Sequence, residues 1–366
     1  MRIATWNVNS VRARAARVVD WLGREEVDAL AMQEIKCRTD QFPYALFEEA
    51  GYEVVAHGTN QWNGVAIASR VGIADVATGF AGQPGFEKGR EGADLPIEPR
   101  ALGATVGSPD AAVRLWSLYV PNGRALADPH YAYKLDWLAA LRADAASWIA
   151  ADPALPLALT GDFNIAPTDA DCGDPSIVPG ISTHVSEPER AAFRAFAEAG
   201  LVDVVRPLAP EGFTYWDYKQ LRFPRDEGMR IDFVLGSPAL ADLVAGAGIH
   251  REERKGDAPS DHVPVVVDLE LDPEDDDRPM ILPCGGSVSI RRLRRLAATA
   301  GRVGRAAAVS RPHPCIGPVS IRRLRRLLDQ RTPGRDRGRG GESARGEEGR
   351  DGDHRGDGED GGGEHG

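Results

Sequence analysis

Apolar positions recur along the first 271 residues with two different periods. Short runs dense in apolar and β-branched residues, which are typical of buried strands, occupy residues 3–8, 29–34, 52–57, 65–69, 102–106, 113–119, 157–161, 231–236 and 263–271. Two segments, 12–22 and 129–151, instead repeat apolar residues at the spacing of one helix face. The pattern therefore predicts a chain with many strands and at least two long helices.

The order of these segments indicates how the strands pair. Runs 52–57 and 65–69 flank the turn-prone Gly58-Thr59-Asn60 and predict a hairpin, and runs 102–106 and 113–119 predict a second antiparallel pair. Helices follow other strands directly, so parallel pairs are expected as well. Mixed sheets that pack face to face, with helices outside, would bury this many strands, and we expect an α/β fold of that kind.

Composition changes sharply after residue 271. Residues 1–271 hold 25 Lys and Arg against 39 Asp and Glu, a net charge of −14, whereas 272–366 hold 19 against 16. The second segment is rich in Arg and Gly and repeats a basic sequence, 283–296, at 314–327. It has too few apolar residues after Leu328 to offset the entropy of ordering the chain. We expect one folded domain, 1–271, and a mostly disordered tail, 272–366, which either binds phosphates through its arginines or is an unselected extension.

The same inspection excludes several classes of protein. The start of the chain lacks the basic and apolar segments of a signal peptide, and no run approaches the length of a membrane span. The four cysteines are too few and too scattered for a zinc site or a disulfide framework: Cys37, Cys172, Cys284 and Cys315. We expect a cytoplasmic protein that does not bind membranes.

Polar residues that could hold a metal ion follow several of the predicted strands. Asn7, Glu34 and Asp162-Phe163-Asn164 each end an apolar run, and Asp261-His262 precede one. Carboxylates gathered at strand ends suit a divalent cation, which prefers oxygen ligands. Each motif alone has an ordinary alternative, such as a solvated strand end or an Asx turn. Together they predict one metal-dependent phosphoryl-transfer centre.

Asp232 is unusual because it lies inside an apolar strand, where Asp is disfavoured. A buried Asp often accepts a hydrogen bond from a His ring and so favours the cationic ring, which makes Asp232 with His262 a candidate pair. The alternative is a satisfied polar pair in the core.

Taken together, these strings resemble the exonuclease III/AP endonuclease branch of the endonuclease–exonuclease–phosphatase superfamily. The matching segments run in order over about residues 1–271: Trp6-Asn7-Val8-Asn9, Val11-Arg12-Ala13-Arg14, Gln33-Glu34-Ile35-Lys36, Tyr119-Val120-Pro121-Asn122-Gly123, Gly161-Asp162-Phe163-Asn164, 213–218, 228–232 and Ser260-Asp261-His262. The resemblance implies a four-layer α/β sandwich, with two packed mixed sheets flanked by helices, and a nuclease that depends on Mg²⁺ or Mn²⁺.

The resemblance also implies roles for individual residues. The metal set would be Asn7, Glu34, Asp162, Asn164, Asp261 and His262, with Glu34 as the principal carboxylate. Asp162 would orient or deprotonate water or protonate the leaving group, while Asn164 would hold a phosphate oxygen or the nucleophile. His262, oriented by Asp232, would stabilise charge on the phosphorane, with Tyr119 beside the phosphate.

The partner implied is double-stranded DNA with abasic sites, nicks or blocked 3′ ends, cut by a monomer that is nucleoid-associated when it acts. Residues expected to contact DNA are Arg12, Arg100, Asn122, Arg124, Lys134, His184, Tyr215 and Trp216. The sequence departs from the family at Tyr215-Trp216, where many relatives have Trp-Phe, and at His184, where they commonly have a smaller residue. His184 would either restrict entry of a flipped-out abasic nucleotide or be a surface residue without a role.

Two other functions remain open at this point. A related phosphodiesterase or phosphatase acting on a non-DNA phosphoester would keep the metal set but lack the aromatic segment 213–218 and the Arg12/Arg14 pair. A DNA-binding protein with a decayed catalytic site would have lost ligand residues, yet each ligand position here holds a competent side chain. The relative strength of AP endonuclease, exonuclease and 3′-phosphatase activities, and the choice between one and two metals, are left undetermined.

Overall fold

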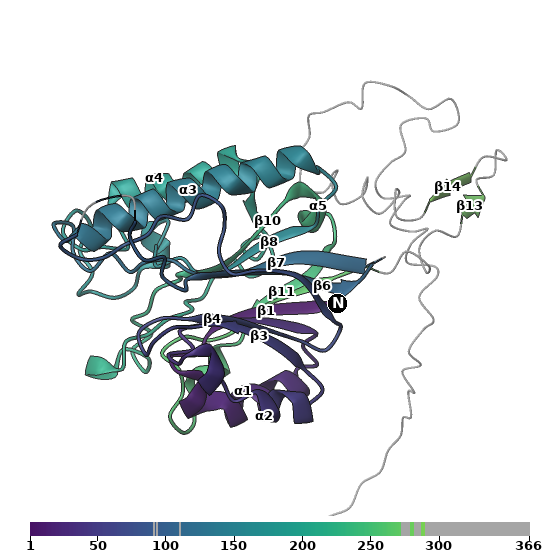
Figure 1. The fold of residues 1–366 in the computed structure, drawn as a ribbon, viewed down its shortest axis with the longest axis horizontal. Helices are drawn as coiled ribbons and strands as arrows, with labels where there is room; N and C mark the ends of the chain where they lie inside the picture. The colour runs from purple at the N-terminus through teal and green to yellow at the C-terminus, as the bar shows by residue number, and fades with distance from the viewer. Residues whose placement is uncertain (91, 93, 110, 272–278, 282–286, 290–366) are drawn as a thin grey trace, which may run out of the picture. The chain divides into compact units, whose positions relative to one another are not determined.

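Two mixed six-stranded sheets contain the strands of the first 271 residues (Figure 1). The structure is a computed structural model that describes residues 1–90, 92, 94–109, 111–271, 279–281 and 287–289. The first sheet has the order β11 (Val244–Ile249), β12 (Val265–Leu269), β1 (Arg2–Asn7), β2 (Ala29–Gln33), β4 (Val65–Ser69) and β3 (Glu53–His57). The second has the order β5 (Ile73–Ala77), β6 (Ala101–Ser108), β7 (Ala111–Tyr119), β8 (Leu157–Asp162), β10 (Asp232–Gly236) and β9 (Val202–Asp203).

Helices cover the outer face of each sheet, which gives four layers (Figure 1). The first sheet carries α1 (Val11–Arg24) and α2 (Tyr44–Glu49), and the second carries α3 (Pro129–Ala151) and α4 (Glu187–Glu198). The remaining helices are short: α5 (Pro238–Ala241), η1 (Thr39–Gln41), η2 (Asp169–Asp171), η3 (Lys219–Leu221) and η4 (Arg251–Arg254). The four-layer sandwich predicted from the sequence is confirmed.

Among the described residues, the three largest apolar cores hold these layers together. One lies between the sheets and is built from small and β-branched residues such as Ile3, Val65 and Val234. The other two lie between the helices and the sheets and contain large aromatic side chains, including Trp21 of α1 and Trp137 of α3. β-branched side chains pack well against a pleated surface, and the large indole rings bury much apolar area between helix and sheet.

Local sequence accounts for where the two long outer helices of the second sheet begin. The Asp128 carboxylate accepts a hydrogen bond from the amide of His130, with Pro129 as the first residue of α3. At α4, Ser186 and Glu189 form a reciprocal capping box. Both devices satisfy amides that have no partner within the helix.

The pattern of pairing brings the polar strand ends together. β1 and β2 pair in parallel at the centre of the first sheet, and β7 and β8 do so in the second. Antiparallel β10 starts opposite the end of β8, so that Asp232 faces Asp162 across the ladder. The polar residues that follow these strands therefore meet at one edge of the sandwich.

The sequence pattern missed β5, β9 and β11, and also the short helices α2 and α5. β11 reads Val-Ala-Gly-Ala-Gly-Ile, a composition with weak strand propensity, and it becomes a strand because β12 supplies the hydrogen-bonding partner. The remaining strands form where they were expected, with ends that differ by a few residues.

Part of the segment expected to be disordered is described. Residues Pro279–Ile281 and Ser287–Ser289 form the two-stranded ladder of β13 and β14. The other residues of the 272–366 tail lie outside the described residues, as do both copies of the basic repeat apart from 287–289. Among the described residues, none of the helices combines the length and apolar character that spanning a bilayer requires.

Candidate active site

Three side chains converge where the two sheets end. One ligand atom from each of Glu34, Asp162 and His262 lies within 4.8 Å of the other two. Asn7, at the end of β1, links them because its amide donates to Glu34 Oε1 at 2.8 Å and to Asp162 Oδ2 at 3.0 Å. Four of the six residues expected to hold a metal thus share one buried cluster.

Glu34 follows β2 in a left-handed backbone conformation, with φ of 51°. Its second oxygen lies 2.7 Å from the Lys36 ammonium. Burial raises the pKa of Glu34, but the charge and hydrogen bond of Lys36 and the hydrogen bond of Asn7 outweigh it, so the pKa lies below its usual value. Glu34 is therefore an ionised carboxylate whose charge faces the cluster.

The electrostatic environment of the Asp162 carboxylate suits a divalent cation. Burial raises the pKa of Asp162 to about 7; His262 opposes this rise, while Asp232 and Glu34 add to it. A site with this many carboxylates and little solvent disfavours its own charge unless a cation is present. Carboxylate oxygens of this kind are the ligands that Mg²⁺ and Mn²⁺ prefer.

Asp232 and His262 form the expected pair, with His262 Nδ1 2.8 Å from Asp232 Oδ2. Burial lowers the pKa of His262, but the carboxylates of Asp232 and then Asp162 outweigh it and raise the pKa to about 10. His262 is therefore a cation at neutral pH. Its other nitrogen, Nε2, lies 3.8 Å from Asp162 Oδ2 and points into the cluster.

Tyr119 ends β7 opposite Asp162 in the parallel ladder. Burial, and then the Glu34 carboxylate, raise the pKa of Tyr119 well above its usual value, so the phenol stays protonated and can donate. The guanidinium of Arg100 lies 4.8 Å from the centre of the Tyr119 ring. Arg100 also pairs with Glu98 at 2.6 Å, so it supports Tyr119 instead of presenting a free charge to a ligand.

Asn164, Asn122 and His184 form a polar wall beside the cluster. The Asn122 amide donates to Asn164 Oδ1 at 3.1 Å and lies 3.4 Å from His184 Nε2. His184 is 7% exposed, so it is not the surface residue that one of the two alternatives assumed. Burial, and then the neighbouring Lys134 ammonium, lower the pKa of His184 to about 4, which keeps the ring neutral.

Asp261 lies at the margin of the site. It belongs to no group of three candidate metal ligands among the described residues. Its carboxylate accepts instead from the Asn9 amide at 2.9 Å, and Lys36 also donates to Asn9, at 2.5 Å. Asn9 and Lys36 were absent from the expected site residues. Their signal was available, since both lie within the strings that contain Asn7 and Glu34.

The residues expected to contact DNA divide into two groups. Arg12, Asn122 and Arg124 are exposed and can reach a ligand. Lys134 and Trp216 are fully buried, so neither side chain is exposed to a ligand in this structure. The Trp216 indole donates to Asp226 at 3.3 Å, and Tyr215 lies with its ring centre 4.9 Å from that of His262. Nothing in the sequence around Lys134 and Trp216 indicated that these two side chains would be buried.

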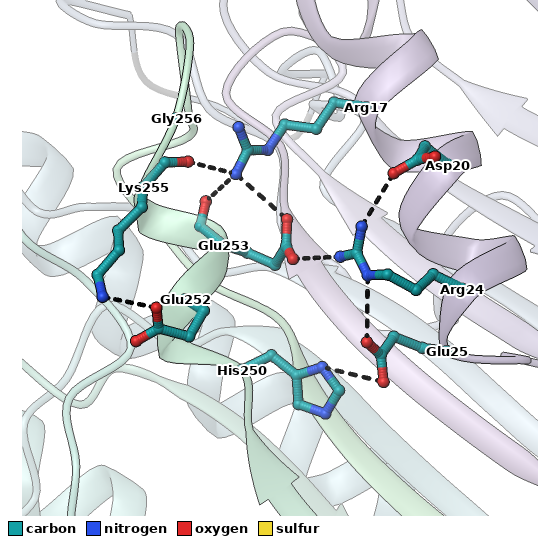
Figure 2. A pocket seen from close by; sticks show the side chains of 9 residues that line it. All are labelled: Arg17, Asp20, Arg24, Glu25, His250, Glu252, Glu253, Lys255 and Gly256. Atoms are coloured by element: carbon teal, nitrogen blue, oxygen red, sulfur yellow. Dashed lines mark hydrogen bonds and ion pairs between the residues drawn. The ribbon is translucent and has the colours of Figure 1, made fainter.

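A separate hollow of about 630 Å³ lies between α1 and η4 (Figure 2). No member of the metal cluster lines this hollow. Its lining residues are Arg17, Asp20, Arg24, Glu25, His250, Glu252, Glu253, Lys255 and Gly256. The charged groups pair with one another, with Glu253 joined to both Arg17 and Arg24. Such pairs near the surface contribute little energy singly, and here they attach η4 to α1.

The chain is similar in sequence to known proteins. Residues 4–262 match the Endonuclease/Exonuclease/phosphatase family. Exodeoxyribonuclease III from Haemophilus influenzae is 29% identical over 281 residues, which cover 74% of this chain and all of the relative.

Solved structures agree with the sequence match. The 3′-5′ exonuclease NExo from Neisseria meningitidis is 38% identical with a TM-score of 0.66, and the match covers 74% of this chain and 100% of that one. The same neisserial enzyme, described as a 3′ phosphatase, has been solved with a product DNA hairpin. An AP endonuclease from Archaeoglobus fulgidus is 33% identical with a TM-score of 0.64, covering 74% of this chain and 99% of that one.

Proposed function

This chain belongs to the endonuclease/exonuclease/phosphatase family, and on that premise we propose that it is a Mg²⁺- or Mn²⁺-dependent nuclease that processes 3′ ends and abasic sites in duplex DNA. It is a hydrolytic enzyme of the DNA-repair type. We further propose that it acts as a monomer in the cytoplasm.

The observation that carries the proposal is the convergence of Glu34, Asp162 and His262 within 4.8 Å at the edge where the sheets end. Phosphoryl transfer needs mainly positioning and neutralisation of charge, and this cluster combines two carboxylates with one imidazolium. A bound divalent cation would be held by Glu34, with Asn7 beside it, and would neutralise the charge that grows on the phosphate.

The residues of the chain divide the remaining work. Asp162, whose Oδ1 accepts from the Asn164 amide at 2.9 Å, orients or deprotonates the attacking water. His262 donates from Nε2 to a phosphate oxygen while Asp232 holds Nδ1. Tyr119, which stays protonated, is a second donor to the phosphate, and Asn164 holds a further oxygen.

His184 bears on the choice among substrates. Its neutral ring lies in the wall formed with Asn122 and Asn164 beside the cluster. A bulky ring there leaves less room for a flipped-out abasic sugar, so we expect 3′-end resection and 3′-phosphate removal to exceed incision at abasic sites. The 38% identical neisserial enzyme is described as an exonuclease and a 3′ phosphatase, which supports this order.

Three 5′-labelled duplexes test the proposal: one with a recessed 3′ end, one with a 3′ phosphate and one with a single abasic analogue. Each is incubated with Mg²⁺, with Mn²⁺ or with EDTA. We expect cation-dependent processing of the first two and weaker incision of the third. No cleavage of any duplex, with hydrolysis of a small phosphoester instead, would favour the alternative of a non-DNA phosphodiesterase or phosphatase.

A further inference from the structure

A buried ion pair joins the two helices of the second sheet and has no part in the chemistry described above. Lys134 of α3 and Glu189 of α4 are both 0% exposed, with Nζ and Oε1 2.5 Å apart. Moving two charges out of water is costly, so a buried ion pair is by itself weak evidence for a role in stability. The pair therefore needs an explanation beyond stability, and its hydrogen bonds supply one.

Lys134 binds the backbone of both asparagines in the wall of the site. Its ammonium donates to the carbonyl of Asn164 at 2.7 Å and to the carbonyl of Asn122 at 3.2 Å. With Glu189 as the third acceptor, its three N–H groups are all used. The ammonium thus fixes the turn after β7 and the turn after β8 with respect to each other.

Glu189 binds the loop that carries His184. Its Oε1 accepts from the His184 amide at 2.9 Å and from the Thr183 hydroxyl at 2.7 Å. Its Oε2 accepts from the amide and hydroxyl of Ser186. This loop is held in a strained form, since His184 has φ of 77°, which L residues rarely adopt.

The contacts of Lys134 and those of the His184 loop meet at the carbonyl of Asn164. His184 Nδ1 lies 2.6 Å from it, and because a carbonyl only accepts, Nδ1 carries the proton. In a neutral ring Nε2 then accepts from the Asn122 amide 3.4 Å away. The ion pair and the histidine tautomer are parts of one connected network behind the wall.

We propose that Lys134 and Glu189 are positioning residues that set the placement of Asn122, Asn164 and His184 without touching the substrate. The role in catalysis rests on the proposed function, whereas the placement itself does not. Misplacement of a positioned group by about 1 Å lowers turnover roughly a hundredfold. The pair should therefore affect turnover beyond the loss that lowered stability alone would cause.

The main test is the double variant Lys134→Met/Glu189→Leu, which removes both charges and leaves no buried charge unpaired. We expect its thermal unfolding midpoint to fall, because the buried amides of His184 and Ser186 lose their acceptor, so kcat is compared well below that midpoint. Its kcat for 3′-end resection should fall roughly tenfold to a hundredfold with an unchanged Mg²⁺ requirement. Arg206→Met is the matched control: it deprives the buried Asp171 of its partner at 2.6 Å, so it should lower stability and leave kcat unchanged.

A second readout does not depend on activity. In the parent protein, the His184 Nδ1–H proton should give a protected NMR signal, and the double variant should lose it while the control keeps it. A folded double variant that retains both kcat and this signal would overturn the proposal. If the parent cleaves no DNA, the proposed function fails and the NMR signal alone decides the positioning role.

A milder substitution covers the case in which the double variant does not fold. Thr183→Val keeps the size of the side chain and removes the hydroxyl that lies 3.1 Å from the Asn122 carbonyl and 2.7 Å from Glu189. We expect a few-fold loss of kcat and weakened protection of the His184 signal. Parent-like values of both would overturn the proposal.

Discussion

Replacing Asp232 by Asn removes the charge that keeps His262 cationic and leaves a side chain of the same shape. Two unit charges 2.8 Å apart attract by about 6 kcal/mol at an effective dielectric constant of about 20. The rise of the His262 pKa from 6.5 to about 10 corresponds to roughly 5 kcal/mol, a similar magnitude to which Asp162 also contributes. Most of the preference for imidazolium thus depends on Asp232.

The consequence should appear as a loss of turnover that depends on pH. Without Asp232, burial lowers the His262 pKa unopposed by its main partner, so the ring loses its proton near neutrality. Losing one preorganised donor to a developing oxyanion costs about a hundredfold to a thousandfold in kcat. The ratio of variant to parent activity should rise as the pH falls, because acid restores the imidazolium in the variant while the parent keeps it up to about pH 10.

The assay is single-turnover resection of a recessed 3′ end at saturating Mg²⁺. It compares the parent with Asp232→Asn, His262→Ala and the double variant. Asp171→Asn is the control, because Asp171 is another buried, ion-paired carboxylate. Because Asp232 acts through the imidazole, the double variant should lose little more than His262→Ala alone. Fully additive losses, or a pH-independent activity ratio, would refute the reasoning.

Four further predictions follow from the same structure. Glu34→Gln should raise the Mg²⁺ concentration needed for half-maximal activity and lower turnover at least about a hundredfold; an unchanged titration would contradict it. His184→Gly suits the left-handed backbone there and should raise abasic-site incision relative to 3′ resection, while an equal change in both would dispose of the idea. Deleting residues 272–366 should leave turnover at saturating DNA unchanged and flatten the salt dependence of binding by about 0.9 per lost phosphate contact, and identical slopes would mean that the tail does not touch DNA. Cys37, 1% exposed and with its thiol pKa raised by burial, should resist maleimide in the native protein; labelling it as fast as in urea, by peptide mapping, would be the contrary result.

The sequence predicted the site best where a residue's chemical type and its place at the end of an apolar run point to the same role. Glu34, Asp162 and His262 each adjoin an apolar run, so strand periodicity alone placed them at strand ends, and their residue types indicated a cation. The partner of His262 could also be inferred, since an aspartate inside the apolar strand β10 has few other reasons to be there. The helix 129–151 was predicted from the spacing of its apolar residues, and the structure gives it the same bounds.

What the sequence could not provide was the burial of long polar side chains. Lys134 and Arg100 look like DNA contacts because their charges are usually exposed, yet both are paired inside the protein. Glu189 gave only a helix-cap signal, although it also holds the loop of His184.

The sequence by itself thus determined which groups are available and at which strand ends they lie, because alternation and helical spacing are local properties of the chain. Tertiary structure alone decided which of these groups face the common centre and which lie behind it. The contacts that decide this join residues far apart in the chain, such as Asn7 with Asp162 and Lys134 with Glu189. Burial and electrostatic pairing depend on these distant contacts, and no local period records them.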